Sequence, residues 1–187
     1  MVINVHSRAH SAILRAWCDD TTYRRLTASD AERGRQQQRG DMIFHDTLAL
    51  LGGEKVFGRA VNSALDFATE VARGLPSASL DHAVAVFAAH GVPSAAIYEL
   101  IGTTRALVRK RRHYTRLSRD ESDRLSRLAR VSARAAEALG DAHKGARRLN
   151  TAHRALVGRR PITLLASDAG TTVVVAVLGR IEHAVPS

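Results

Sequence analysis

Hydrophobic side chains recur at helical spacing along most of the chain from residue 41 onward. Apolar positions three and four residues apart predict amphipathic helices, and the Gly and Pro residues between them predict turns. The expected helices cover residues 42–51, 56–71, 80–89, 95–101, 105–113, 119–139, 142–149, 162–165 and 171–183.

Polar residues at the starts of these stretches predict where the helices begin. Ser118 and Glu121 form a capping box, in which each side chain accepts a hydrogen bond from a backbone N–H of the other residue. Ser, Thr and Asp bind the first free N–H groups of a helix, and Pro suits the first helical position. On these grounds we expect the other helix starts at Ser77 or Ser79, Ser94, Thr104, Asp141, Pro161 and the Ser167-Asp168 pair.

The last stretch, residues 171–183, carries two conflicting signals. Three consecutive valines beginning at Val173 favour a strand by propensity. The length of the stretch and its apolar residues at helical spacing, which end with Leu178 and Ile181, favour a helix. We therefore expect a helix here, and an all-α fold for the whole chain.

The first 40 residues have a different pattern. They are polar apart from a short amphipathic stretch that ends at Trp17, and residues 31–40 form a low-complexity polar run. Such a composition buries too little apolar surface to hold a fold. Residues 1–40 are therefore expected to be a mobile N-terminal arm or linker, followed by two helical domains at residues 41–117 and 118–187.

The stretch from Ser94 to Arg112 has the features of a helix–turn–helix. Gly102 permits a tight turn, and Leu100 and Leu107 can lock the two helices together. The second helix would place polar and basic side chains in the major groove and on phosphates. The candidate DNA-binding residues are Ser94, Thr103, Thr104, Arg105, Arg109, Lys110 and Arg112. The same pattern is also compatible with an ordinary helical hairpin that has a solvated basic face.

The charge balance favours acidic or polyanionic partners. The 187 residues include 28 Lys and Arg against 18 Asp and Glu, for a formal net charge of +10, and only Lys55, Lys110 and Lys144 are lysines. Guanidinium groups bind phosphates and carboxylates through two hydrogen bonds at once. An arginine-rich genome would produce a similar excess, so the charge supports DNA binding without deciding it.

The sequence matches no catalytic or metal-binding motif. Cys18 is the only cysteine, and the nine histidines are scattered. A glycine-rich phosphate loop, a nucleophile elbow and a zinc-binding histidine pair are all missing. We therefore expect a protein that is not an enzyme and has no catalytic residues, no metal site and no cofactor. No apolar run is long enough for a membrane span or a secretory signal, so the expected location is the bacterial cytoplasm.

From about Leu48 onward the chain resembles the Xre/MbcA/ParS-type antitoxins, which are partners of RES-domain toxins. The resemblance rests on several motifs in a fixed order rather than on one short match. In order, they are Leu50-Leu-Gly-Gly53, Gly74-Leu-Pro76, Gly91-Val-Pro-Ser94, Ile101-Gly-Thr-Thr104, Leu117-Ser-Arg-Asp-Glu-Ser122, Arg124-Leu-Ser-Arg-Leu-Ala129, Ala155-Leu-Val-Gly-Arg-Arg-Pro161, Leu164-Leu165, Gly170 and Leu178-Gly-Arg-Ile-Glu-His183.

The resemblance implies an antitoxin of a type II toxin–antitoxin system. Such a protein would form a homodimer, bind the double-stranded operator of its own operon, and dock its C-terminal domain on a RES-domain toxin. NAD would then be the substrate of the toxin and not a cofactor of this chain. The C-terminal helix and tail would block the entrance to the toxin's pocket. The candidate toxin-binding residues are Arg159, Arg160, Arg180, Glu182 and His183.

Three positions depart from the pattern of the family. Arg148 and Leu149 stand where a Trp-Leu pair is usual, Val157 stands where a second Gly is expected, and Ala184 stands where another Gly is expected. Two other functions stay open on the sequence alone. One is a transcriptional regulator that has no toxin partner, and the other is a toxin-neutralising module that no longer reads DNA.

Overall fold

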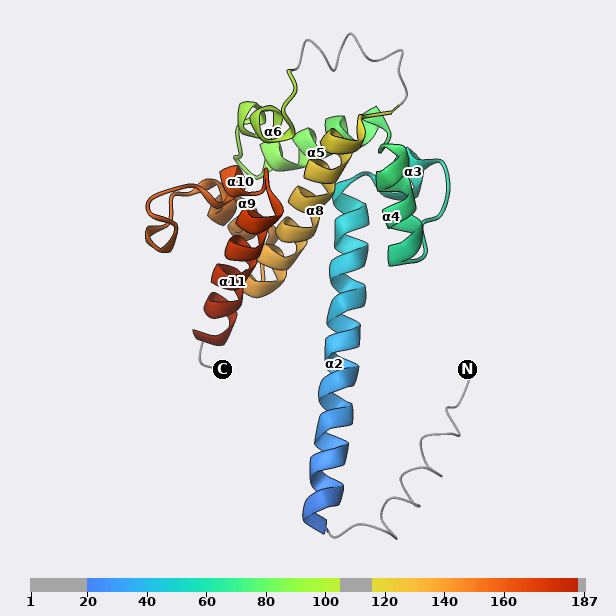
Figure 1. Cartoon of the computed structure of the whole chain (residues 1–187), viewed down its shortest axis with the longest axis vertical. Helices are drawn as coiled ribbons and strands as arrows, with labels where there is room; N and C mark the ends of the chain where they lie inside the picture. Colours follow the sequence, from blue (N-terminus) through green and yellow to red (C-terminus); the bar gives the residue numbers. More distant parts are fainter. Residues whose placement is uncertain (1–19, 105–115, 185–187) are drawn as a thin grey trace. The chain divides into compact units, whose positions relative to one another are not determined.

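The computed structural model describes residues 20–104 and 116–184 (Figure 1). Every regular element in these two ranges is a helix, and the only strand-like feature is an isolated bridge between Pro76 and Arg116. The prediction of an all-α fold is therefore confirmed. Residues 43–187 form one compact unit, and the residues before them form a separate unit.

The first described helix, α2, runs from Asp20 to Leu50. The expectation that residues 1–40 hold no regular structure is therefore wrong for residues 20–40. That these residues form a mobile arm stays a prediction, and residues 1–19 lie outside the described part. Ala, Glu, Arg and Gln in the polar run are good helix formers, so the backbone coils although residues 36–40 are exposed. The helix ends where the sequence predicted, because Gly52 (φ 94°) and Gly53 (φ 57°) take left-handed conformations.

The single helix predicted over residues 56–71 is two helices in the structure. Helix α3 covers Gly53–Phe57 and ends at Gly58 in a left-handed conformation, and helix α4 covers Ala64–Arg73. Ser63 begins α4, since its side chain accepts a hydrogen bond from the Asp66 N–H at 3.1 Å. Helical spacing of the apolar residues continued through the break, which hid it in the sequence.

Helices α5 (Ser77–Ala89) and α6 (Ser94–Ile101) lie where the sequence predicted helices, but their caps differ. The residues before them are Pro76 and Pro93, and neither start has a side-chain cap. The predictions that Ser77 or Ser79 caps α5 and that Ser94 caps α6 are therefore wrong. A proline N-cap has the extended backbone that helix entry requires, so the serines fall inside the helices.

Helix α8 (Arg119–Leu139) confirms the predicted capping box. The Ser118 hydroxyl accepts a hydrogen bond from the Glu121 N–H at 3.2 Å, and the Ser118 N–H donates to the Glu121 carboxylate at 2.9 Å. Side chains are buried on nearly every face of α8. The helix packs against α4 and α6 on one part of its surface and against α9 and α11 on another (Figure 1).

The C-terminal part consists of α9 (Ala142–Asn150), the 3-10 turn η2 (Arg154–Leu156), α10 (Pro161–Leu164) and α11 (Asp168–Ala184). Asp141 caps α9 as predicted, because its carboxylate accepts from the Lys144 N–H at 2.6 Å. The helix predicted over residues 171–183 is confirmed and begins three residues earlier, at Asp168. Tertiary packing of Val174, Val177 and Leu178 against the core overrides the strand propensity of the valines.

One hydrophobic core runs through the compact unit. It includes Leu80 and Phe87 of α5, Leu125 and Leu128 of α8, and Val174 of α11. The sequence predicted a domain boundary between residues 117 and 118, but both sides of it belong to the same compact unit. That the two sides of this boundary act as separate functional domains stays a prediction.

Candidate DNA-binding and toxin-binding surfaces

Helix α6 provides the first half of the predicted helix–turn–helix. Ile97, Leu100 and Ile101 are buried, as the sequence predicted. Gly102 (φ 78°) ends the helix in a left-handed conformation that residues with a Cβ rarely adopt. The predicted turn at Gly102 is therefore confirmed.

Arg124 of helix α8 supports this turn. Its guanidinium donates to the Ile101 carbonyl at 3.2 Å, and a Cβ added at Gly102 would collide with the same guanidinium. The turn needs glycine for its backbone conformation, while a Cβ there would displace the end of the flexible Arg124 side chain. The sequence offered no sign of this contact, because Arg124 lies more than twenty residues after the turn.

The predicted DNA-binding residues divide into described and undescribed groups. Ser94 is half-buried at the first residue of α6, Thr104 is exposed, and Thr103 is 7% exposed. A side chain buried as deeply as Thr103 is in a poor position to reach a base edge. The basic candidates Arg105, Arg109, Lys110 and Arg112 lie outside the described residues.

A buried carboxylate holds the chain where it leaves the region of residues 105–115. Glu70 of α4 is 2% exposed and receives hydrogen bonds from Arg59 at 2.9 Å and from Arg116 at 3.0 Å. Arg116 also donates to the Gly74 carbonyl at 2.6 Å. Sequence reasoning missed this contact, because Glu70 and Arg116 are 46 positions apart.

The charges around Glu70 set its ionisation. Burial has the largest single effect and raises the pKa of Glu70, but the hydrogen bonds and charges of Arg116 and Arg59 outweigh it. The pKa of Glu70 therefore lies below its ordinary value of 4.5. The carboxylate stays ionised and keeps both arginines in place.

The predicted toxin-binding residues lie on and beside the C-terminal helices. Arg159 and Arg180 are exposed. Arg160 is half-buried and donates to the Asn150 side chain at 3.3 Å, so part of its binding capacity is already used within the fold. Glu182 and His183 belong to α11, but their side chains lie outside the described residues.

The turn between α9 and α10 contains His153 and leads to Arg159 and Arg160. His153 begins η2, where its Nδ1 atom accepts a hydrogen bond from the Ala155 N–H at 3.2 Å, and its own N–H donates to the Arg159 carbonyl at 3.1 Å. Burial, and after it the positive charges of Arg148, Arg154 and Arg180, lower the pKa of His153 below 6.5. The imidazole is thus neutral near pH 7 and is available as an acceptor.

Arg127 ties helix α8 to the start of helix α11. Its guanidinium forms ion pairs with Asp123 and, at 3.2 Å, with Asp168, and it donates to the Leu165 carbonyl at 3.3 Å. The side chain of Arg127 is only 10% exposed. This contact fixes the base of the helix whose far end carries the predicted tail residues.

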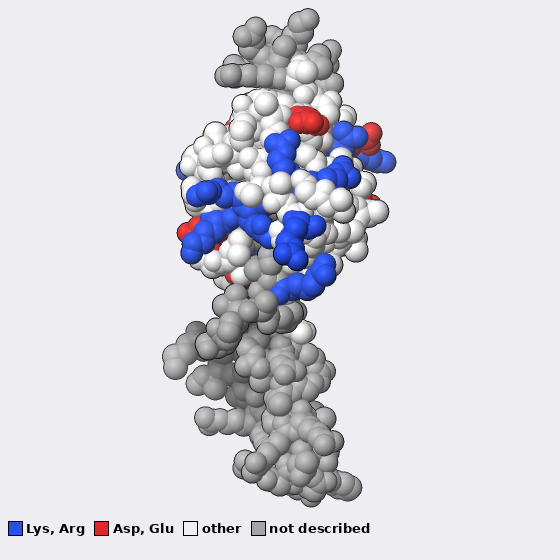
Figure 2. Space-filling model, turned by 90° about the vertical axis from the view of Figure 1, so that its left-hand side faces the viewer, with Lys and Arg blue, Asp and Glu red and all other residues white. Residues whose placement is uncertain are grey.

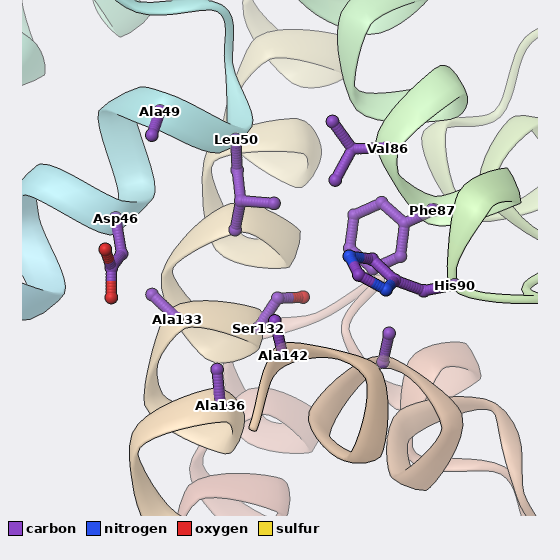
Figure 3. A pocket seen from close by; sticks show the side chains of 11 residues that line it. Asp46, Ala49, Leu50, Val86, Phe87, His90, Ser132, Ala133, Ala136 and Ala142 are labelled. Atoms are coloured by element: carbon purple, nitrogen blue, oxygen red, sulfur yellow. The ribbon is translucent and has the colours of Figure 1, made fainter. Parts of the chain in front are cut away.

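Figure 3 shows a pocket of about 320 Å³ between the end of α2, α5, α8 and α9. Side chains of Leu50, Phe87, His90 and Ser132 converge on it. Most of its lining is alanine and other apolar residues, so it offers few groups for chemistry.

The described residues contain no group of three or more His, Cys, Asp and Glu side chains that could hold a metal ion. Among the helices of the described ranges, none has both the length and the hydropathy that crossing a bilayer requires.

Comparison with known proteins assigns both halves of the compact unit. Residues 66–130 match the model of the antitoxin Xre-like helix–turn–helix domain, and residues 134–184 match the model of the antitoxin Xre/MbcA/ParS C-terminal toxin-binding domain. The protein named Antitoxin Xre from Yersinia enterocolitica serotype O:8 / biotype 1B (strain NCTC 13174 / 8081) is 34% identical over 96 residues. The match spans 50% of this chain and 65% of the length of that relative. The chain therefore belongs to the Xre-type antitoxins, with a helix–turn–helix domain followed by a toxin-binding domain.

Proposed function

We propose that this chain neutralises a cognate toxin by direct binding and represses its own operon by binding operator DNA. The proposed toxin is a RES-domain protein that consumes NAD, the partner that the sequence resemblance implies. NAD is then a substrate of the toxin, and the antitoxin itself needs no cofactor and catalyses no reaction. The proposed assembly is a homodimer within a larger toxin–antitoxin complex in the bacterial cytoplasm.

The observation that carries this proposal is the succession of two binding domains along one compact unit. The helix–turn–helix match ends at residue 130 and the toxin-binding match begins at residue 134, both within helix α8. A regulator without a toxin partner would have no use for the second domain. The match at residues 134–184 therefore favours the antitoxin over that alternative.

For DNA binding, we assign Arg105, Arg109, Lys110 and Arg112 to the operator. The turn at Gly102 brings the chain out of α6 directly before these residues. Arginine and lysine at the start of a recognition helix bind phosphates and guanine edges. Since the contacts replace condensed counterions, operator binding should weaken steeply as salt is added.

For toxin binding, we assign the end of helix α11 and the residues after it. Arg180 is exposed, and the start of α11 is anchored to α8 by the Arg127–Asp168 ion pair. An anchored helix whose far end carries charged side chains can present them to a polar nucleotide pocket. Arg180, Glu182 and His183 are the residues proposed to block it.

Co-expression with the neighbouring toxin gene tests the function. In a host cell, the toxin alone should deplete NAD and stop growth, while the toxin with this chain should leave both normal. NAD measured in cell extracts and growth curves report the result. If this chain binds the toxin in a pull-down but NAD still falls, neutralisation by direct binding is wrong.

Two variants test whether the two activities use separate surfaces. The double change Arg105→Ala and Arg109→Ala should weaken operator binding by about tenfold or more, since each base or phosphate contact contributes about 1–3 kcal/mol, yet leave NAD protected. Deletion of the residues after Gly179 should abolish the protection of NAD, yet leave operator binding unchanged. Gel-shift titration and the NAD measurement check both, and a truncated chain that protects NAD fully would exclude the blocking tail.

A further inference from the structure

The residues matched to the toxin-binding domain carry a net positive charge. Residues 134–184 include eight Lys and Arg against four acids, and between Ala142 and Ile181 the only acid is Asp168. Asp168 is already engaged, because it forms an ion pair with Arg127 of helix α8. The positive charge of this part is therefore not balanced within it.

Several arginines elsewhere in the described fold have acidic partners, although Arg119 and Arg124 bind backbone carbonyls instead. Arg59 and Arg116 bind Glu70, and Arg127 binds Asp123 and Asp168. The arginines of the C-terminal part differ. Among the described residues, no ion pair is formed by Arg147, Arg148, Arg154, Arg159 or Arg180.

Three of these cations lie within electrostatic reach of His153, and one of them, Arg154, directly follows it in the chain. Arg148 of α9, Arg154 of η2 and Arg180 of α11 lie close enough to His153 for their charges to disfavour its protonation. We call these three residues the arginine cluster. Like charges brought together repel one another, so a fold that gathers them loses stability unless an anion binds there.

The arginine cluster is accessible. Arg154 and Arg180 are exposed, and Arg148 is half-buried. Figure 2 shows that Lys and Arg side chains gather on the side of the molecule that carries the C-terminal helices, with few acidic side chains among them. A guanidinium presented in this way can bind a carboxylate through two hydrogen bonds.

We propose that the arginine cluster around His153 docks on an acidic, carboxylate-lined surface of the toxin, as a contact additional to the blocking tail. The proposal rests on the proposed function, since it concerns the same partner. It adds Arg148 and Arg154 to the toxin interface. Electrostatic complementarity of this kind speeds association and makes it dependent on salt.

A protein surface fits the cluster better than a DNA backbone. All three arginines belong to the stretch matched to the toxin-binding domain, residues 134–184, and none belongs to the helix–turn–helix match. The residues proposed for the operator lie in a different part of the chain, from Arg105 to Arg112. DNA binding by the cluster is an outcome that the experiment below detects.

The experiment measures the Kd of the full-length chain for the RES-domain toxin encoded beside its gene, at low and at high NaCl. The double variant Arg148→Gln and Arg154→Gln removes two charges from the cluster. Lys55→Gln with Arg130→Gln removes two exposed charges elsewhere and serves as the matched control. The single variant Arg154→Gln is included in case a change at the half-buried Arg148 also affects folding. The lysine variant, Arg148→Lys with Arg154→Lys, keeps the charge at both positions.

The cluster variant should bind the toxin about tenfold or more weakly at low salt, with a smaller loss of affinity on adding salt than the unchanged chain. The control pair and the lysine variant should stay close to the unchanged chain. If the glutamine variants bind the toxin normally, the inference is wrong while the proposed function stands. The same holds if they lose only affinity for operator DNA. An unchanged chain that does not bind the toxin at all would overturn both.

Discussion

Val157 has a backbone conformation that its side chain disfavours. It is the only described residue other than glycine with a positive φ, at 54°, and its side chain is 92% exposed. β-branched residues clash with their own backbone in the left-handed region, and an exposed side chain makes few contacts that could offset this cost. The conformation ends the 3-10 turn η2. It also explains why a glycine would be expected at this position.

Replacing Val157 with glycine should therefore stabilise the fold. We expect Val157→Gly to raise the free energy of unfolding by about 1 kcal/mol, since relief of the left-handed strain exceeds the entropy that glycine adds to the unfolded chain. Urea titration measures the change. Val157→Ala is the control, because alanine keeps the Cβ and should gain much less. Equal gains for the two variants would mean that the exposed apolar surface, and not the backbone, is the cause.

Glu70 is a buried charged residue whose loss should lower the stability of the fold. Glu70→Gln removes the charge and keeps the shape, and leaves Arg59 and Arg116 without their anion. Removing one partner of a fully buried pair costs roughly 3–5 kcal/mol. The two arginines are 46% and 43% exposed, so we expect a smaller loss of about 2 kcal/mol. Glu99→Gln, an exposed change on α6, should have almost no effect in the same urea titration.

The lowered pKa of Glu70 also predicts a pH dependence. Because the folded chain binds this proton less tightly than the unfolded chain, the carboxylate contributes stability that is fully present above its ordinary pKa of 4.5. That contribution is lost as the pH falls through the lowered folded value. The unfolding free energy of the unchanged chain should therefore drop more steeply in acid than that of Glu70→Gln. Parallel curves for the two proteins would contradict this.

At the scale of single residues, the sequence predicted contacts between near neighbours and missed distant ones. The capping box of Ser118 and Glu121 and the cap at Asp141 could be predicted because donor and acceptor lie three positions apart. The partners of Glu70 could not, since only the folded chain brings Arg116 beside it. The arginine cluster was missed in part for the same reason.

At the scale of elements, the approach of helix α9 to helix α8 depends on one glycine. A Cβ added at Gly145 would lie 2.8 Å from the Ala136 backbone nitrogen and 3.0 Å from the Ala135 carbonyl carbon. These are backbone atoms, which cannot move aside as a flexible side chain can. Gly179 of α11 is the opposite case, because nothing lies within 4 Å of its added Cβ.

The two glycines form a matched pair for mutation. Gly145→Ala should lower the free energy of unfolding by about 1–3 kcal/mol, because the helices must separate. Gly179→Ala should raise it by roughly 0.5–1 kcal/mol, the usual advantage of alanine within a helix. Thermal unfolding followed by circular dichroism compares them directly. A stabilised Gly145→Ala protein would mean that α8 and α9 pack less closely than described.

Helix ends were predicted well where the chain itself marks them, and poorly where it does not. Gly52, Gly140 and Pro161 are local signals, and helices end or begin at each of them. The break between α3 and α4 carries a glycine too, but apolar spacing continued across it. The polar run in α2 was misjudged, because a polar composition indicates only that little surface is buried. A solvent-exposed helix can form without burying apolar surface.

At the scale of the whole molecule, we expect helix α8 to make the compact unit of residues 43–187 unfold cooperatively. Leu128 of α8 is fully buried, and the helix packs against both the N-terminal and the C-terminal helices. We expect Leu128→Ala to cost about 2–5 kcal/mol. Hydrogen exchange should then rise together in α5 and α11, because both depend on the same helix. Arg130→Gln is an exposed control on α8 that should leave both unchanged. Loss of protection in α11 alone would indicate two independently folding domains.

The continuous helix α8 also limits how such proteins can be recombined. The boundary between the two matched domains falls between residues 130 and 134, in the middle of an unbroken helix. A chimera that joins the first matched domain of one relative to the second matched domain of another would have its junction inside this helix. Side chains of α8 would then no longer fit the helices packed on either side of it, so a stable chimera must keep α8 together with the residues that contact it.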